Sequence, residues 1–204
     1  MSQLYNRSTN ELKLDISNEL LNKALSFQEY LTLMEKWFLA YKKSDDKDPW
    51  VVGLTNKSIT AMRRLKKTYL PEMHIIKQLK KIEAPVIWLT VIDFCSIDTL
   101  PIISVVQFLS EWNDTITHKI LHQDTLPDDL DGYFDKMELS PGLKVYALKS
   151  DSLHLLAEWN ARPEGAQQLI DEDKEPRILV ENVRDWYVED RGEEVANEFI
   201  NAIL

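Results

Sequence analysis

The chain has 204 residues, and 34 acidic against 24 basic side chains give it a net charge of −10 at pH 7. Such a charge repels phosphate backbones, so we expect no nucleic-acid partner. A hydrophobic fraction of 44% with six Trp, seven Tyr and six Phe is typical of a packed globule. No window approaches the roughly 18 consecutive apolar residues of a membrane helix, so no membrane partner is expected either.

The N-terminal stretch MSQLYNRSTNELKLD lacks the continuous apolar segment and the small-residue cleavage site of a signal peptide. The chain has one cysteine, Cys95, which excludes an internal disulfide framework. We therefore expect a cytoplasmic protein.

Residues 1–82 are predicted to form a helical extension packed on the core. Apolar residues recur at spacings of three and four after Ser26, which is the expected N-cap of an amphipathic helix. The polar run KSDDKDP and its Pro49 are expected to end that helix. Helices are predicted over about 26–43, over about 56–68 and from Pro71 onward.

From residue 83 to residue 204 the pattern is that of an α/β domain. The run VIWLTVIDF (86–94) is almost continuously apolar and rich in β-branched residues, which predicts a strand buried on both faces. The next predicted elements are a helix over 100–112, a strand over 115–123, a short helix over 127–137, strands over 143–150 and 153–159, a helix over 163–170 and one long helix over 178–204. A parallel pair joined by a crossover and followed by an antiparallel hairpin requires a mixed sheet flanked by helices.

This order of elements is that of the thioredoxin fold, and the segment from about 56 to 170 resembles a known family. It is similar to bacterial thioredoxin-family proteins whose active-site motif reads Trp-Cys-Gly-Asp in place of Cys-x-x-Cys. The matching stretches are NKSITAMRRLKK, WLTVIDFCSID, LPII, LAEWNARPEGAQQL and DWYVEDRGEEVANEF. The resemblance implies a thioredoxin-like fold with Cys95 at the position of the reactive cysteine.

The motif of this chain, FCSID (94–98), departs from that of the family. A Phe and a Ser flank Cys95 where the family has Trp and Gly, and Asp98 occupies the position of a thioredoxin's resolving cysteine. The resemblance places the family's cis-proline near residue 143, where this chain has Leu143, and Pro141 lies two residues earlier. Whether a cis-proline survives there is left open.

The lone thiol limits the chemistry. Dithiol exchange needs a second thiol to resolve the mixed disulfide, and this chain has none. Cys95 is then either an inert cysteine in a degenerate scaffold that binds a protein partner, or the thiol of a monothiol redox protein. In the second case a small thiol such as glutathione completes the cycle. The helix that follows favours the Cys95 thiolate, whereas Asp93 and Asp98 disfavour it.

No metal and no cofactor are expected. No other ligand accompanies Cys95 at a zinc-like spacing, and the five glycines form no phosphate loop. His118 and His122 lie on one face of a predicted strand, where structural or surface roles are expected. By resemblance, Arg162 lies at the same end of the sheet as Cys95. There it pairs with Asp98 or with a ligand's carboxylate, or it is only a capping or surface residue.

Two surfaces are candidates for partner binding. One is a basic cluster, which is either a solvated helix face or a local positive field that favours a thiolate or an anionic partner. Its members are Arg63, Arg64, Lys66, Lys67, Lys77, Lys80 and Lys81. The other is the apolar surface of the N-terminal helices, where Trp37, Phe38 and Trp50 would be exposed if they did not pack on the core.

Overall fold

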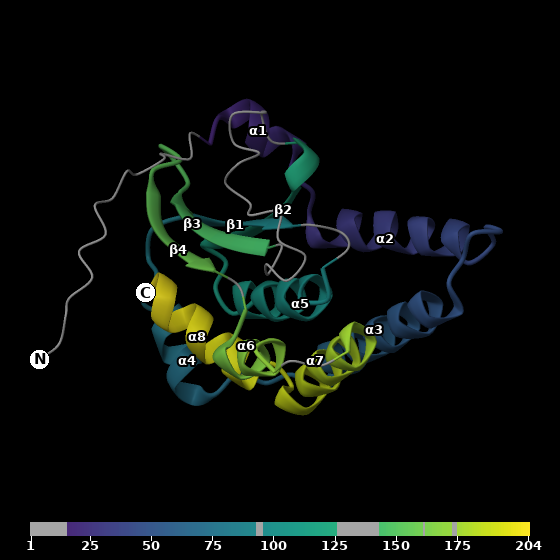
Figure 1. Cartoon of the computed structure of the whole chain (residues 1–204). Helices are drawn as coiled ribbons and strands as arrows, with labels where there is room; N and C mark the ends of the chain where they lie inside the picture. The colour runs from purple at the N-terminus through teal and green to yellow at the C-terminus, as the bar shows by residue number, and fades with distance from the viewer. Residues whose placement is uncertain (1–15, 93–95, 126–142, 161, 173–174) are drawn as a thin grey trace, which may run out of the picture.

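The computed structural model describes residues 16–92, 96–125, 143–160, 162–172 and 175–204. Its centre is one four-stranded sheet in the order β2-β1-β3-β4 (Figure 1). The strands are β1 (Val86–Ile92), β2 (Ile116–His122), β3 (Leu143–Lys149) and β4 (Leu155–Asn160). β1 is parallel to β2 and antiparallel to β3, which is antiparallel to β4. The predicted mixed sheet is confirmed.

Helices cover both faces of this sheet. The helices are α1 (Asn18–Lys23), α2 (Phe27–Tyr41), α3 (Pro49–Thr68), α4 (Met73–Leu79), α5 (Thr99–Ser110), α6 (Glu164–Ile170), α7 (Pro176–Asp190) and α8 (Glu193–Ile203), and a 3-10 turn, η1, spans Gln123–Thr125. In Figure 1, α1 lies on one side of the sheet, and α5 and α8 lie on the other. α2 packs against β2 and α3 packs against α5 and α7, and the two helices meet at the turn that joins them (Figure 1).

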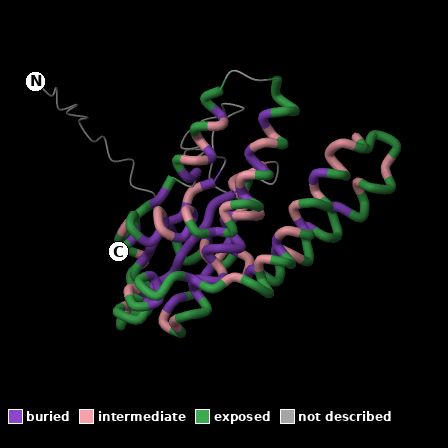
Figure 2. The backbone as a smooth tube through the Cα atoms, turned by 90° about the horizontal axis from the view of Figure 1, so that it is seen from below, coloured by how far each residue is buried: buried purple, intermediate pink, exposed green. Residues whose placement is uncertain are grey.

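β1 is the centre of the core, and all seven of its residues are buried. Alternate side chains point to opposite faces, as strand geometry requires. Ile87, Leu89 and Val91 pack in a cluster with residues of α1, whereas Trp88 and Ile92 belong to the larger cluster formed with α5 and α8. Figure 2 shows buried residues gathered on the sheet and on the helix faces turned toward it. The continuous apolar run in the sequence is explained by this double coverage.

Local sequence signals set the helix starts. Ser26 and Glu29 form a capping box at the start of α2, so the predicted N-cap is confirmed. Pro49, predicted only to end the preceding helix, opens α3 seven residues earlier than expected. The carboxylate of Asp48 accepts the N–H of Trp50 at 2.8 Å, and proline has no N–H to lose in a first turn.

The prediction of a single long C-terminal helix is wrong, because the segment forms two helices, α7 and α8. Arg191 and Gly192 have φ values of 54° and 82° and end α7 before α8 begins. A Cβ at Gly192 would lie 2.6 Å from Cγ2 of Val105 in α5, so glycine is required for the conformation and for the close approach.

The helices before residue 82 pack on the same core as the rest of the chain. Phe27, Met34, Ile59 and Leu79 belong to one apolar cluster with the sheet and α5. The domain division at residue 82 stays a prediction, and the helix predicted over 127–137 lies outside the described residues. Among the helices that are described, none is long and apolar enough to cross a bilayer.

The aromatic partner surface predicted on the N-terminal helices is reduced. Phe38 is buried in the core, and only Trp37, 48% exposed and stacked on Tyr41, presents much of its ring. Trp50 is half-buried and donates its indole N–H to Glu181 at 2.9 Å. These three side chains therefore do not form a continuous apolar patch.

Candidate functional site

The site is at the carboxyl end of β1, where the chain enters α5. Asp98 is the N-cap residue of α5, and its side chain is fully buried. Cys95 lies outside the described residues, so its expected place beside this site remains a prediction. The described part of the site is built around the Asp98 carboxylate.

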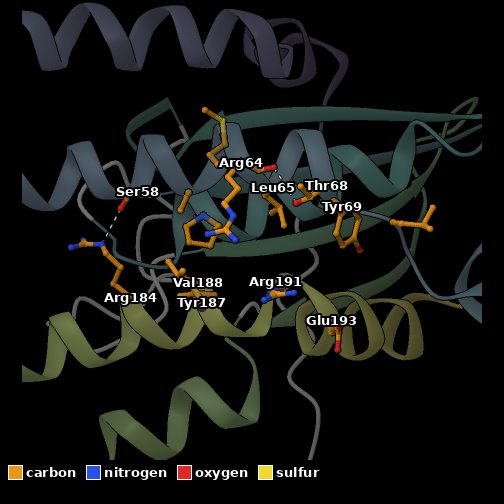
Figure 3. Close-up of a pocket in the computed structure, with 14 residues that line it drawn as sticks. Ser58, Arg64, Leu65, Thr68, Tyr69, Arg184, Tyr187, Val188, Arg191 and Glu193 are labelled. Atoms are coloured by element: carbon orange, nitrogen blue, oxygen red, sulfur yellow. Dashed lines mark hydrogen bonds between the residues drawn. The ribbon is translucent and has the colours of Figure 1, made fainter.

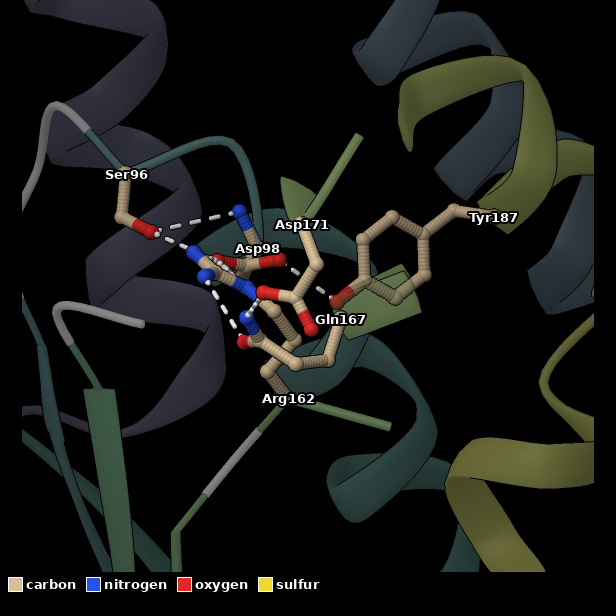
Figure 4. A network of polar contacts seen from close by, with 6 residues as sticks. All are labelled: Ser96, Asp98, Arg162, Gln167, Asp171 and Tyr187. Atoms are coloured by element: carbon tan, nitrogen blue, oxygen red, sulfur yellow. Dashed lines mark hydrogen bonds and ion pairs between the residues drawn. The ribbon is translucent and has the colours of Figure 1, made fainter. Parts of the chain in front are cut away.

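Arg162, which follows β4, forms a buried ion pair with Asp98. Its Nη2 and Nε both donate to Oδ2 of Asp98, at 2.6 Å and 3.1 Å (Figure 4). The two side chains are 4% and 0% exposed. A carboxylate removed from water to this extent is tolerated only with a partner of opposite charge, and Arg162 is that partner.

The second oxygen of the Asp98 carboxylate is also bonded. The hydroxyl of Tyr187, from α7, donates to Oδ1 at 2.7 Å. Burial, and then the negative charge of Asp98, raise the pKa of Tyr187 well above its ordinary value. Tyr187 therefore stays a protonated donor at any physiological pH.

Three further side chains complete what we call the Asp98 cluster (Figure 4), which consists of Ser96, Asp98, Arg162, Gln167, Asp171 and Tyr187. Ser96 Oγ donates to Asp98 Oδ2 at 3.3 Å and accepts the Asp98 N–H at 3.2 Å. Arg162 Nη1 donates to Gln167 Oε1 at 3.3 Å, and Gln167 Nε2 donates to Asp171 at 2.8 Å. The cluster thus joins α5, α6 and α7 to the end of the sheet.

The structure brings two of the predicted site residues, Asp98 and Arg162, together. Arg162 is neither a surface residue nor free for a ligand's carboxylate through its Nη2 and Nε, because both bind Asp98. Tyr187 was missed, since it lies 89 residues from Asp98. Its one sequence signal is helical spacing, which places Tyr187 on the buried face of α7 with Val183.

His118 has the structural role that the sequence predicts for it. His118 is buried between Thr90, 2.9 Å from Nε2, and Gln107, 3.0 Å from Nδ1, as a structural residue would be. Burial lowers the pKa of His118 to about 3. Within the described residues, no three His, Cys, Asp or Glu side chains are grouped in a way that could hold a metal ion.

The described geometry defines the class of protein: an α/β chain with a thioredoxin-like mixed sheet and a polar cluster at the N-terminus of the crossover helix. The sequence model of a family described as Thioredoxin matches residues 51–175, more than half of the chain. The chain therefore belongs to the thioredoxin family.

Two solved structures share the fold. One is the 1.5 Å crystal structure of PA1234, a protein of unknown function from Pseudomonas aeruginosa, with a TM-score of 0.54 and 14% identity over 90% of this chain and 96% of that one. The other is an HIV epitope-scaffold, with a TM-score of 0.53 and 16% identity over 90% and 97% of the two chains. A search of curated proteins gave no match.

Proposed function

We propose that this chain is a thioredoxin-family scaffold without dithiol oxidoreductase activity, which acts by binding a partner. The observation that supports this is the state of Asp98. At the position where the resemblance places a resolving thiol, the chain has a fully buried carboxylate bound by Arg162 and Tyr187. Asp98 has a structural role in place of a redox role.

Chemistry points the same way. Release of a substrate from a mixed disulfide requires attack by a second thiolate, and the full sequence contains only Cys95. A carboxylate cannot make that attack, because it forms no bond to sulfur that would displace the substrate thiol. Because dithiol exchange with a substrate is excluded, the proposed partner is one that the chain binds through non-covalent contacts at its surface or in a pocket.

The alternative is a monothiol redox protein acting through Cys95. Cys95 precedes the start of α5 by four residues, and α5 is a 12-residue helix whose N-terminus favours anions. In this case the Cys95 thiolate attacks the mixed disulfide of a glutathionylated substrate, releases the substrate thiolate and forms a disulfide with glutathione. A glutathione thiolate then attacks that disulfide, frees the Cys95 thiolate and leaves as glutathione disulfide.

Alkylation of Cys95 by iodoacetamide between pH 5 and pH 9, followed by mass spectrometry, separates these two functions. The scaffold predicts a rate profile with an apparent pKa at or above about 8.5, the value of a free thiol. It also predicts that Cys95→Ser leaves the unfolding midpoint unchanged. A profile shifted to about pH 7 or lower, with rapid formation of a glutathione adduct, would instead establish the monothiol function.

A further inference from the structure

A pocket of about 270 Å³ lies between α3 and α7, and Tyr187, whose hydroxyl binds Asp98, is part of its lining (Figure 3). Side chains of the two helices point toward one another across it, and Pro101 of α5 and Glu193 of α8 complete its lining. Its size suits one small molecule.

Part of the lining is apolar and incompletely covered. Met62, Leu65 and Pro101 contribute buried or partly buried surface to the lining, and Leu70 and Val188 contribute exposed surface. Leu70 is 72% exposed and Val188 is 43% exposed. An apolar ligand body would remove these side chains from water, which is favourable in proportion to the area covered.

The charged part of the lining is cationic in an acidic protein. The lining contains three arginines and one carboxylate, and so carries a formal charge of +2, whereas the whole chain carries −10. The charged residues are Arg64, Arg184, Arg191 and Glu193. A second hollow adjoins the pocket and shares Arg64 and Arg184 with it. A concave surface of one sign concentrates ligands of the opposite sign.

Two buried polar atoms of the lining have no hydrogen-bond partner among the described residues: Nη1 of Arg184 and the hydroxyl of Tyr69. Arg184 is only 8% exposed, and its Nε donates to Ser58 at 3.0 Å. Buried donors are almost always satisfied in folded proteins, and an unsatisfied one needs an explanation. An anionic acceptor bound beside Arg184 would supply it.

From these observations we infer that the pocket binds a small amphiphilic carboxylate, with its carboxylate at Arg64 and Arg184 and its apolar body along Leu65 and Val188 toward Leu70. Arginine donors in a partly apolar pocket favour a planar, singly charged head group. The small volume and the acidic surface of the rest of the molecule disfavour a polyanion. The inference rests on the proposed function only in taking binding as the activity of the chain.

Isothermal titration of the full chain tests the site with three ten-carbon probes. Decanoate is expected to bind saturably below its micelle concentration, decan-1-ol to bind about tenfold more weakly, and decylammonium not to bind, because only decanoate pairs with arginine. Equal binding of decanoate and decan-1-ol, or no saturation by decanoate, would overturn the inference. These probes do not react with thiols, so the outcome is independent of the alkylation profile of Cys95.

Two neighbouring arginines of α3 provide a matched pair of variants. Arg64 lines the pocket, whereas Arg63 pairs with Glu35 at 3.0 Å outside it. Arg64→Gln should weaken decanoate binding about tenfold, and Arg63→Gln, which makes the same change in net charge, should leave it within about twofold. Equal weakening by both would show that decanoate responds to overall charge and not to this pocket. Because both side chains are exposed, both variants are expected to fold.

Discussion

Replacing Arg162 with methionine tests whether the Asp98 cluster is an energetic part of the fold. Arg162→Met removes both hydrogen bonds to Oδ2 and leaves a 0% exposed carboxylate without its cation. Removing one partner of a buried ion pair costs about 3–5 kcal/mol, because the remaining charge keeps its desolvation penalty. The Tyr187 bond to Oδ1 remains, but it does not neutralise the charge.

Urea unfolding at pH 7 measures this loss. With a slope of about 2.5 kcal/mol per molar urea, the midpoint of Arg162→Met should fall by about 1–2 M. The control is Arg63→Met, the same substitution in an ion pair with side chains 64% and 49% exposed, which should cost less than about 1 kcal/mol. Equal losses in the two variants would refute the reasoning.

The double variant Asp98→Asn/Arg162→Met keeps the measurement informative even if Arg162→Met does not fold. It removes both charges and retains an oxygen that can accept the Tyr187 hydroxyl. Since a buried pair is far less costly to remove than to break, the double variant should recover at least about half of the loss. A double variant as unstable as Arg162→Met would mean that geometry, and not the unpaired charge, dominates.

Two further predictions concern glycine and histidine. Gly192→Ala should lower the free energy of unfolding, measured in urea, by about 2 kcal/mol or more, because the φ of 82° and the 2.6 Å approach to Val105 exclude a Cβ. The control is Gly53→Ala in the interior of α3, where a Cβ would meet nothing within 4 Å. This variant should stabilise the chain by up to about 1 kcal/mol. His118, with a folded-state pKa of about 3, stays neutral while the unfolded chain protonates below pH 6.5, so stability should fall by about 2 kcal/mol between pH 7 and pH 5 through this residue. His118→Gln should lose that part of the pH dependence, and an unchanged slope would contradict the assignment.

The sheet could be predicted because its signals are local. The apolar run of β1 and the turn between β3 and β4 are each contained in a few consecutive residues. The break at Gly192 was missed, because the requirement for glycine comes from the packing of α5 against that turn and not from the helical spacing on either side. The opening of α3 at Pro49 was missed because the same proline both ends a helix and begins one.

The candidate site was predictable only in part. Asp98 and Arg162 could be placed together by the resemblance, since both belong to its matching stretches. Tyr187 also belongs to a matching stretch and has the helical spacing of a buried residue, but neither signal indicates that its hydroxyl meets a carboxylate 89 residues earlier. The pocket between α3 and α7 could not be predicted from the sequence either, since it forms only where the two helices pack beside each other.

The distance along the chain between the members of the Asp98 cluster has a consequence for synthesis. The charge of Asp98 is neutralised only after Arg162, 64 residues later, has been synthesised. Its second oxygen is bound only after Tyr187, 89 residues later, has followed. Loop closure over such separations is slow and precedes any gain from the contact. A nascent chain that ends before Arg162 therefore carries a carboxylate that its own core cannot accept, and native docking of α5 is delayed until Arg162 has left the ribosome.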